Sequence, residues 1–256
     1  MRRVTFALPF LAIPLAAAAC GGGKSASTST AALPDDPLAA VKGAARKTAQ
    51  AGSERTKLAG SVVASGQTIT FTGGGAFDTK TQLGSMSVDL SISGLNSTVD
   101  EVSHGTVVYV KSDLISAMLP AAKKWMKLDL AKTVKSAGVS SLLSQDPAQA
   151  LTQLQTSLRD VTKVGEAQVD GVATTHYRAR IDLSKVTAAA TGTGRYDVWI
   201  GGDGYVHRVK AIVTTAGTTS TVTTDLSAFG DPVSVTVPPA SETFDGRNST
   251  IPGLGG

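Results

Sequence analysis

Apolar side chains recur at every second position along much of this chain of 256 residues, and this pattern constrains the fold more than any other feature. Ile69, Phe71 and Phe77, for example, share one face of a segment whose other face carries threonines. Such alternation predicts half-buried β-strands. Ser65-Gly66 and Asp170-Gly171 have the composition of two-residue hairpin turns between strands. The strands follow one another without the helices that a parallel sheet needs. We therefore predict an antiparallel meander of about eleven strands.

A helix is expected before the first strand. Asp35 or Asp36 can cap it, and Pro37 suits its first turn. Gly52 is expected to follow its end. The apolar stripe of this helix would consist of Leu38, Val41, Ala45 and Thr48.

The strand pattern breaks at residues 131–160, where a second helix is expected. Asp146 can cap this helix and Pro147 can begin it. Its apolar stripe would consist of Leu151, Leu154 and Leu158. A shorter helical turn is expected at residues 113–119. The fold class predicted from these patterns is therefore α+β.

The first residues, MRRVTFALPFLAIPLAAAAC, have the composition of an export signal. Arg2 and Arg3 form a short positive region, an uncharged run follows, and small residues end it. Pro9 and Pro14 interrupt the run, which is shorter than the roughly 20 apolar residues that span a bilayer. We therefore expect residues 1–19 to be a signal peptide and the protein to be exported.

The chain has one cysteine, Cys20, and it directly follows the small residues. A single cysteine excludes an intramolecular disulfide. The stretch Ala17-Ala18-Ala19-Cys20 resembles the lipid-attachment signal of bacterial lipoproteins, in which leucine is usual at the position of Ala17. The resemblance implies cleavage before Cys20, acyl chains on it, and anchoring to the outer face of the cytoplasmic membrane. The alternative is an ordinary exported protein with an incidental cysteine.

Residues 20–33 are mostly Gly, Ser, Thr and Ala, which predicts a flexible tether about 20 Å long on average. A domain is expected at residues 34–237 and a tail at residues 238–256. The prolines of residues 228–256 favour a wrapping or frayed segment. The net charge of +4 falls to +2 without the two arginines of the signal. No Lys/Arg cluster with interleaved aromatic residues occurs, so we expect no nucleic-acid binding.

One stretch in the second half of the chain, residues 165–177, has the sequence GEAQVDGVATTHY. Ile181-Asp182-Leu183, Val198-Trp199-Ile200 and the segment GYVHRV at residues 204–209 follow it. These motifs, with the predicted order of elements behind a lipoprotein signal, resemble the actinobacterial envelope lipoproteins of the LppX/LprG kind. That family lies within the LolA-like lipoprotein-carrier superfamily, and the resemblance covers residues 38–237.

The resemblance implies a strongly curved antiparallel sheet, a half-open barrel with helices packed on its concave face. It also implies that acyl chains of a lipid or an acylated glycolipid lie between sheet and helices. Several residues expected to point inward are small, among them Gly60, Gly73 and Gly75. Small residues leave room for a ligand or mark places where a sheet bends, and both alternatives stay open at this stage.

If a cavity is present, large apolar residues are expected to form its wall or lid; in a filled core the same residues would simply pack together. The candidate lipid-binding residues are Phe71, Trp125, Met126, Leu151, Leu154, Leu158 and Trp199.

The sequence contains no G-x-S-x-G, P-loop or H-E-x-x-H motif. His104, His176 and His207 are far apart in the sequence and are expected to be surface or hydrogen-bonded residues. We therefore expect no enzymatic activity, no metal and no cofactor. The expected function is binding or transfer of a lipid or acylated glycolipid by a membrane-anchored lipoprotein, with an envelope transporter or another protein as a further partner. The alternative is a non-carrier lipoprotein of the same fold that binds a protein or acts in signalling.

Overall fold

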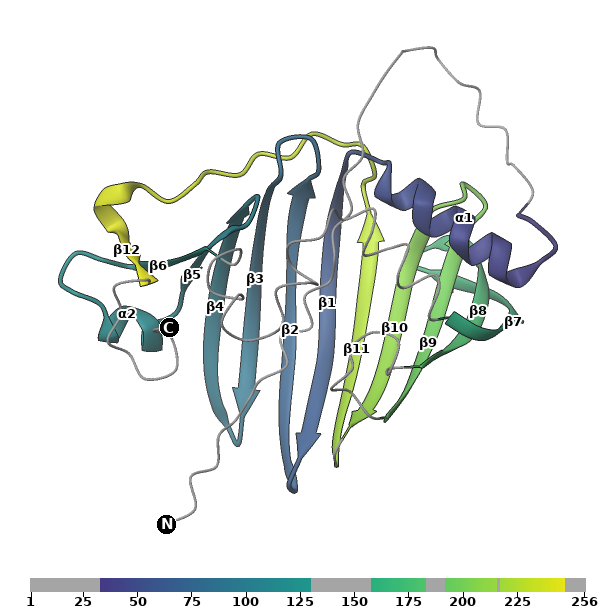
Figure 1. Ribbon diagram of the computed structural model, residues 1–256, viewed down its shortest axis with the longest axis horizontal. Coiled ribbons are helices and arrows are strands. Elements are labelled where there is room, and N and C mark those ends of the chain that lie inside the picture. The colour runs from purple at the N-terminus through teal and green to yellow at the C-terminus, as the bar shows by residue number, and fades with distance from the viewer. Residues whose placement is uncertain (1–32, 130–157, 183–191, 216, 247–256) are drawn as a thin grey trace.

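The structure, a computed structural model, describes residues 33–129, 158–182, 192–215 and 217–246. These residues form one sheet of twelve strands and two α-helices (Figure 1). The strands are β1 (Ser53–Ala64), β2 (Gln67–Asp78), β3 (Leu83–Ile92), β4 (Leu95–His104), β5 (Val107–Lys111), β6 (Trp125–Asp129), β7 (Leu158–Val169), β8 (Val172–Asp182), β9 (Gly192–Gly201), β10 (Val206–Thr215), β11 (Thr218–Ser227) and β12 (Thr243–Asp245). The helices are α1 (Pro37–Ala49) and α2 (Asp113–Met118).

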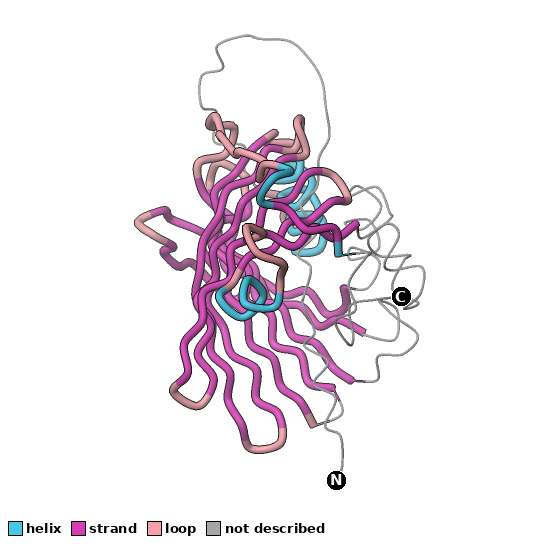
Figure 2. Tube along the Cα trace, turned by 90° about the vertical axis from the view of Figure 1, so that its left-hand side faces the viewer, coloured by secondary structure: helices cyan, strands magenta, loops and turns pink. Residues whose placement is uncertain are grey.

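Two antiparallel meanders make up the sheet, β1 to β6 and β7 to β11. They are joined where β1 pairs with β11, with Arg55 opposite Ser227 and Val63 opposite Thr219. Figure 2 shows the curvature of the sheet, and α1 lies on the side toward which it curves. The predicted fold class is confirmed. The twelfth strand, β12, was not predicted because it has three residues and pairs in parallel with β6, away from any hairpin.

Among the hairpins whose turn residues are all described, four turn through two residues each, as the paired ends of their strands show. In three of them both turn residues have positive φ: Ser65-Gly66, Ser93-Gly94 and Asp170-Gly171. Positive φ at both positions defines the type I′ turn, whose twist matches that of the strands it joins. The hairpins predicted at Ser65-Gly66 and Asp170-Gly171 are confirmed.

Helix α1 begins where the sequence predicts. The Asp36 carboxylate accepts a hydrogen bond from the Ala39 backbone N–H at 3.0 Å, and Pro37 follows. Its buried residues are Ala40, Val41 and Ala44, so the stripe lies slightly to one side of the predicted one. The helix contacts β7, β9 and β10.

The core of the described residues lies beneath α1. Its buried members are Ala40, Val41, Ala44, Leu158, Tyr177, Ala179, Val198, Ile200 and Val206. A hydrogen bond from the Val206 backbone N–H to the Thr48 hydroxyl (2.9 Å) fastens the end of α1 to β10. We call the face of the sheet that α1 covers the inner face.

Helix α2 is the helical turn predicted at residues 113–119. The Ser112 hydroxyl caps it by accepting from the Ile115 backbone N–H at 3.2 Å. The helix contacts β5 and β6. Among the residues that the structure describes, no helix is long and apolar enough to cross a membrane.

The second predicted helix falls mainly on residues 130–157, outside the described residues, and so do Leu151 and Leu154. The prediction that Leu158 belongs to the apolar stripe of this helix is wrong. Leu158 begins β7, lies opposite Ile181 and is 8% exposed in the core. Its spacing from Leu154 also fits a helix, but pairing with β8 and packing beneath α1 place this residue in the sheet.

After β11 the chain crosses the ends of the first meander to its far edge (yellow in Figure 1). The Gly230 backbone N–H donates to the Ser53 carbonyl at 2.9 Å, and the Ser53 hydroxyl donates to the Asp231 carbonyl at 2.6 Å. A short 3₁₀ turn (Ala240–Glu242) then leads into β12. We call residues 228–245 the C-terminal strap. These residues wrap the sheet. The predicted division into a domain at residues 34–237 and a tail at residues 238–256 stays a prediction.

Several inner-face glycines allow close approach of neighbouring groups. A Cβ at Gly73 or Gly75 would overlap the backbone carbonyl of Ser87 or Ser85 on β3. At Gly60 it would overlap both the Thr221 backbone carbonyl on β11 and the Phe71 ring. The first two glycines therefore permit tight strand curvature, and the third is covered by an aromatic ring.

Replacing Gly75 with alanine is expected to destabilise the fold by roughly 1–3 kcal/mol, because the new methyl group meets backbone that cannot move aside. The matched control is Gly43→Ala in α1, where nothing lies within 4 Å of the added Cβ. That change should stabilise the protein by up to about 1 kcal/mol through helix propensity. Urea denaturation of both variants measures the difference, and equal midpoints would contradict the steric role of Gly75.

Candidate functional site: the inner face of the sheet

The pairing register shows which side chains share the inner face, since directly opposed residues point to the same side. The three rows nearest the turns at residues 65–66 and 93–94 are almost entirely apolar. They consist of Val62, Ile69, Ile92 and Leu95; of Gly60, Phe71, Leu90 and Ser97; and of Leu58, Gly73, Val88 and Val99. The next two rows carry carboxylates, Glu101 beside Met86 and Glu54 beside Phe77. The inner face of the first meander is thus apolar at one end and acidic at the other.

Burial differs between the two meanders. Beneath α1 the inward side chains of the second meander form the compact core. On β1 to β4 the large apolar side chains Leu58, Phe71, Val88 and Leu90 are only half-buried. This part of the inner face therefore carries apolar surface that is available to a further apolar group.

Three of the predicted lipid-binding residues lie on the inner face, and one of them, Leu158, belongs to the core beneath α1. Phe71 lies opposite Leu90 on the neighbouring strand. Met126 lies opposite Val110 and is 3% exposed. Contact of either residue with a ligand stays a proposal.

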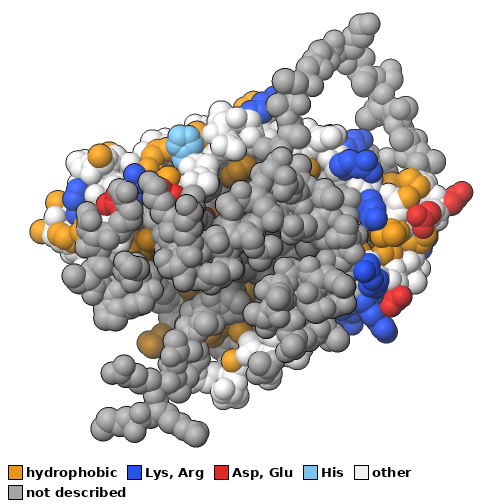
Figure 3. Space-filling model, in the orientation of Figure 1, with side chains coloured by type: hydrophobic (Ala, Val, Ile, Leu, Met, Phe, Trp, Pro, Cys, Tyr) orange, Lys and Arg blue, Asp and Glu red, His pale blue; other side chains and the backbone are white. Residues whose placement is uncertain are grey.

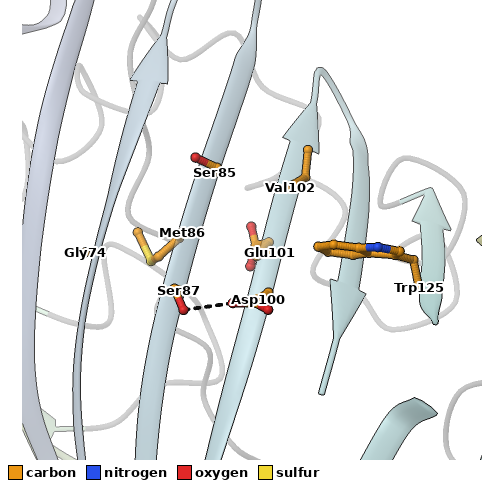
Figure 4. A pocket seen from close by; sticks show the side chains of 8 residues that line it. All are labelled: Gly74, Ser85, Met86, Ser87, Asp100, Glu101, Val102 and Trp125. Atoms are coloured by element: carbon orange, nitrogen blue, oxygen red, sulfur yellow. Dashed lines mark hydrogen bonds between the residues drawn. The ribbon is translucent and has the colours of Figure 1, made fainter. Parts of the chain in front are cut away.

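Trp125 points to the other side of the sheet, because it is adjacent to Met126 in the same strand. Its ring lies 5.5 Å from the Lys111 ammonium and lines a shallow pocket of about 280 Å³ (Figure 4). In this pocket the Ser87 hydroxyl donates to the Asp100 carboxylate at 2.8 Å. The structure thus separates Trp125 from Phe71 and Met126 by the thickness of the sheet.

Trp199 also lies on the outer face, where it stacks on His176 with ring centroids 4.3 Å apart. His176 in turn contacts Asp197 at 2.8 Å. Arg178 and Arg195 lie 2.7 and 3.1 Å from the same carboxylate. Burial opposes ionisation of Asp197, but hydrogen bonds from His176 and Arg178 and the arginine charges lower its pKa below the usual value.

This outer-face cluster has a structural explanation, in which a buried carboxylate is satisfied by its neighbours. The prediction that His176 is a hydrogen-bonded residue is confirmed. It is also confirmed for His207, whose ring nitrogen lies 3.0 Å from the Asp203 carboxylate.

The two inner-face carboxylates were not among the predicted site residues. Burial raises the pKa of Glu54 from 4.5 to about 7. Burial also raises the pKa of Glu101 above its usual value. Neither effect is visible in the sequence, where each glutamate occupies an ordinary position in an alternating strand. The alternation itself nevertheless places Glu54 on the same face as Leu58.

Glu54→Gln is expected to remove a pH dependence of stability. The pKa of Glu54 is about 7 in the folded protein and 4.5 in the unfolded chain. The contribution of Glu54 to the free energy of unfolding is therefore complete below pH 4.5 and is lost as the pH rises through 7. The free energy of unfolding of the parent should fall by about 3 kcal/mol more than that of the variant across this window. Urea denaturation at several pH values measures it. Glu166→Gln, which removes an exposed carboxylate, should leave the fall in place; identical profiles for parent and Glu54→Gln would contradict the assignment.

Comparison with known proteins agrees with this architecture. The chain is 35% identical over 108 residues to lipoprotein LprA of Mycobacterium tuberculosis (strain ATCC 25618 / H37Rv) and to putative lipoprotein LprA of Mycobacterium bovis. The match spans 39% of this chain and 43% of the length of each of those proteins. The crystal structure of the M. tuberculosis lipoprotein LppX has a TM-score of 0.54 at 16% identity, covering 78% of this chain and 98% of LppX. That likeness shows the fold.

Residues 77–235, more than half of the chain, match the LppX_LprAFG lipoprotein family. This segment includes the VDG-x-x-TTHY hairpin on which the sequence resemblance was based. The chain therefore belongs to the LppX_LprAFG lipoprotein family.

Proposed function

We propose that this protein is a membrane-anchored envelope lipoprotein that binds or transfers a lipid or acylated glycolipid on the inner face of its first meander. The observation that carries the proposal is the half-buried apolar surface of β1 to β4, beside the buried core that packs beneath α1 on the second meander. Acyl chains gain about 0.8 kcal/mol for each CH₂ group removed from water, so such a surface favours them.

The anchor in this proposal is Cys20, acylated after removal of residues 1–19, on the outer face of the cytoplasmic membrane. Membership of a lipoprotein family supports it. Two or three acyl chains give stable attachment, whereas one gives only marginal binding. The protein holds its ligand without converting it, and the inner-face carboxylates lie at the end of the apolar rows where a polar head group would be placed.

Leu90→Glu tests the proposal directly. Leu90 lies in the middle apolar row, so the added carboxylate would meet any acyl chain bound there. We expect the affinity for a long-chain fluorescent fatty acid to fall at least about tenfold. A tenfold loss corresponds to about 1.4 kcal/mol of binding free energy, and a charge placed against an acyl chain should cost more than that. The matched control is Thr70→Glu, which places the same charge on the exposed outer face of β2.

Unchanged affinity in Leu90→Glu, with a folded protein by circular dichroism, would contradict acyl binding on this face. If Thr70→Glu instead abolished capture of an envelope protein partner while Leu90→Glu did not, the non-carrier alternative would be supported. Native mass spectrometry of the mildly extracted protein would identify a copurifying lipid.

A further inference from the structure

Exposed hydrophobic side chains gather at one end of the strands of the first meander, where two hairpins turn. We call residues 63–68 and 92–95 the edge. Of the five large hydrophobic residues exposed in the described part of the chain, three flank two hairpin turns: Leu95 is 77% exposed, Val63 42% and Ile92 38%. The turns themselves, Ser65-Gly66 and Ser93-Gly94, lie at the same end of the sheet, at the bottom of Figure 1. Leu95 directly follows its turn as the first residue of β4, and it is the most exposed of the three.

The two turns are also uncharged. Residues 63–68 have the sequence VASGQT, and residues 92–98 have the sequence ISGLNST. An apolar medium would therefore receive this edge without the cost of burying a charge. The Lys and Arg side chains seen in Figure 3 gather at a different place, around α1 and the second meander. Attraction to this edge would thus be hydrophobic in origin.

The edge is continuous with the candidate site. Ile92 and Leu95 are opposed across β3 and β4, and they end the apolar rows of the inner face. From there apolar side chains follow row after row to the level of Val88, while Glu54 and Glu101 lie at the far end. A hydrocarbon chain could therefore move from this edge to the site without leaving apolar surface.

We propose that the edge formed by residues 63–68 and 92–95 inserts into a lipid bilayer and is the place where acyl chains pass between the bilayer and the inner face. This inference rests on the proposed function and adds the route of loading. Only thirteen positions separate Cys20 from Leu33, the first described residue, and they span at most about 45 Å. Acylation of Cys20 would therefore hold the domain within reach of the bilayer.

The test uses the whole chain from position 20 with Cys20→Ser, so that no acyl anchor contributes. Leu95→Asp is compared with Val164→Asp, which alters a valine on β7 that is 50% exposed. The probe is neutral phosphatidylcholine vesicles in a flotation assay, because anionic lipids would also attract the basic side chains. We expect Leu95→Asp to reduce vesicle binding about tenfold or more and Val164→Asp to leave it unchanged. Leu95→Trp should increase binding.

A second measurement separates this edge from the site itself. Val63→Asp changes an exposed residue of the same edge whose side chain lies on the face opposite the apolar rows. This variant should slow transfer of a fluorescent fatty acid from vesicles to the protein, while its affinity for the same fatty acid in vesicle-free solution stays within twofold of the parent, roughly 0.4 kcal/mol. Vesicle binding of Leu95→Asp equal to that of Val164→Asp would overturn the inference. If no variant, including the parent, bound the free fatty acid, the proposed function would fail, and the flotation result would still decide whether the edge binds a bilayer.

Discussion

The pairing of β1 with β11 is the interaction on which the rest of the molecule depends. Each meander is built from local hairpins, but the two become one sheet only where Arg55 meets Ser227 and Val63 meets Thr219. Helix α1 precedes β1 in the chain yet packs on β7, β9 and β10. Packing of the helix on the second meander is therefore a long-range contact of the same kind as this pairing. Because such a contact closes a very long loop, it is expected to make folding slower than hairpin formation.

The same arrangement divides the inner face into two parts with different roles. The second meander is completed by α1, and its side chains pack as a core in which Ile200 is fully buried. The first meander has apolar residues of similar size without that cover from α1. Its glycines at positions 73 and 75 bring neighbouring strands close and so curve the surface instead of leaving separate holes. A concave apolar surface next to a finished core is suited to a ligand with long hydrocarbon chains.

Local sequence signals predicted most of the fold. Asp36 and Pro37 mark the start of α1, and turns such as Ser65-Gly66 mark hairpins, because each acts through its own backbone. Leu158 was misplaced because its four-residue spacing from Leu154 fits a helix, whereas the pairing with Ile181 that places it in the sheet involves another strand. The site was predicted only in part, since aromatic size suggested Trp125 and Trp199 as cavity residues. Trp125 and Met126 are neighbours in one strand and therefore point to opposite faces, but which of the two faces inward depends on the pairing register.

The C-terminal strap has a consequence for how copies of this protein coexist. An exposed sheet edge can pair with the edge of another molecule, and anchoring on a surface would raise the local concentration of such edges. At one side β12 covers β6, and the salt bridge between Lys124 and Glu242 (3.1 Å) holds the strap beside it. At the other side β7 is irregular, with two register shifts and the exposed charges of Lys163 and Glu166. Both ends of the described sheet thus discourage strand-to-strand polymerisation, even where many copies of the protein lie close together.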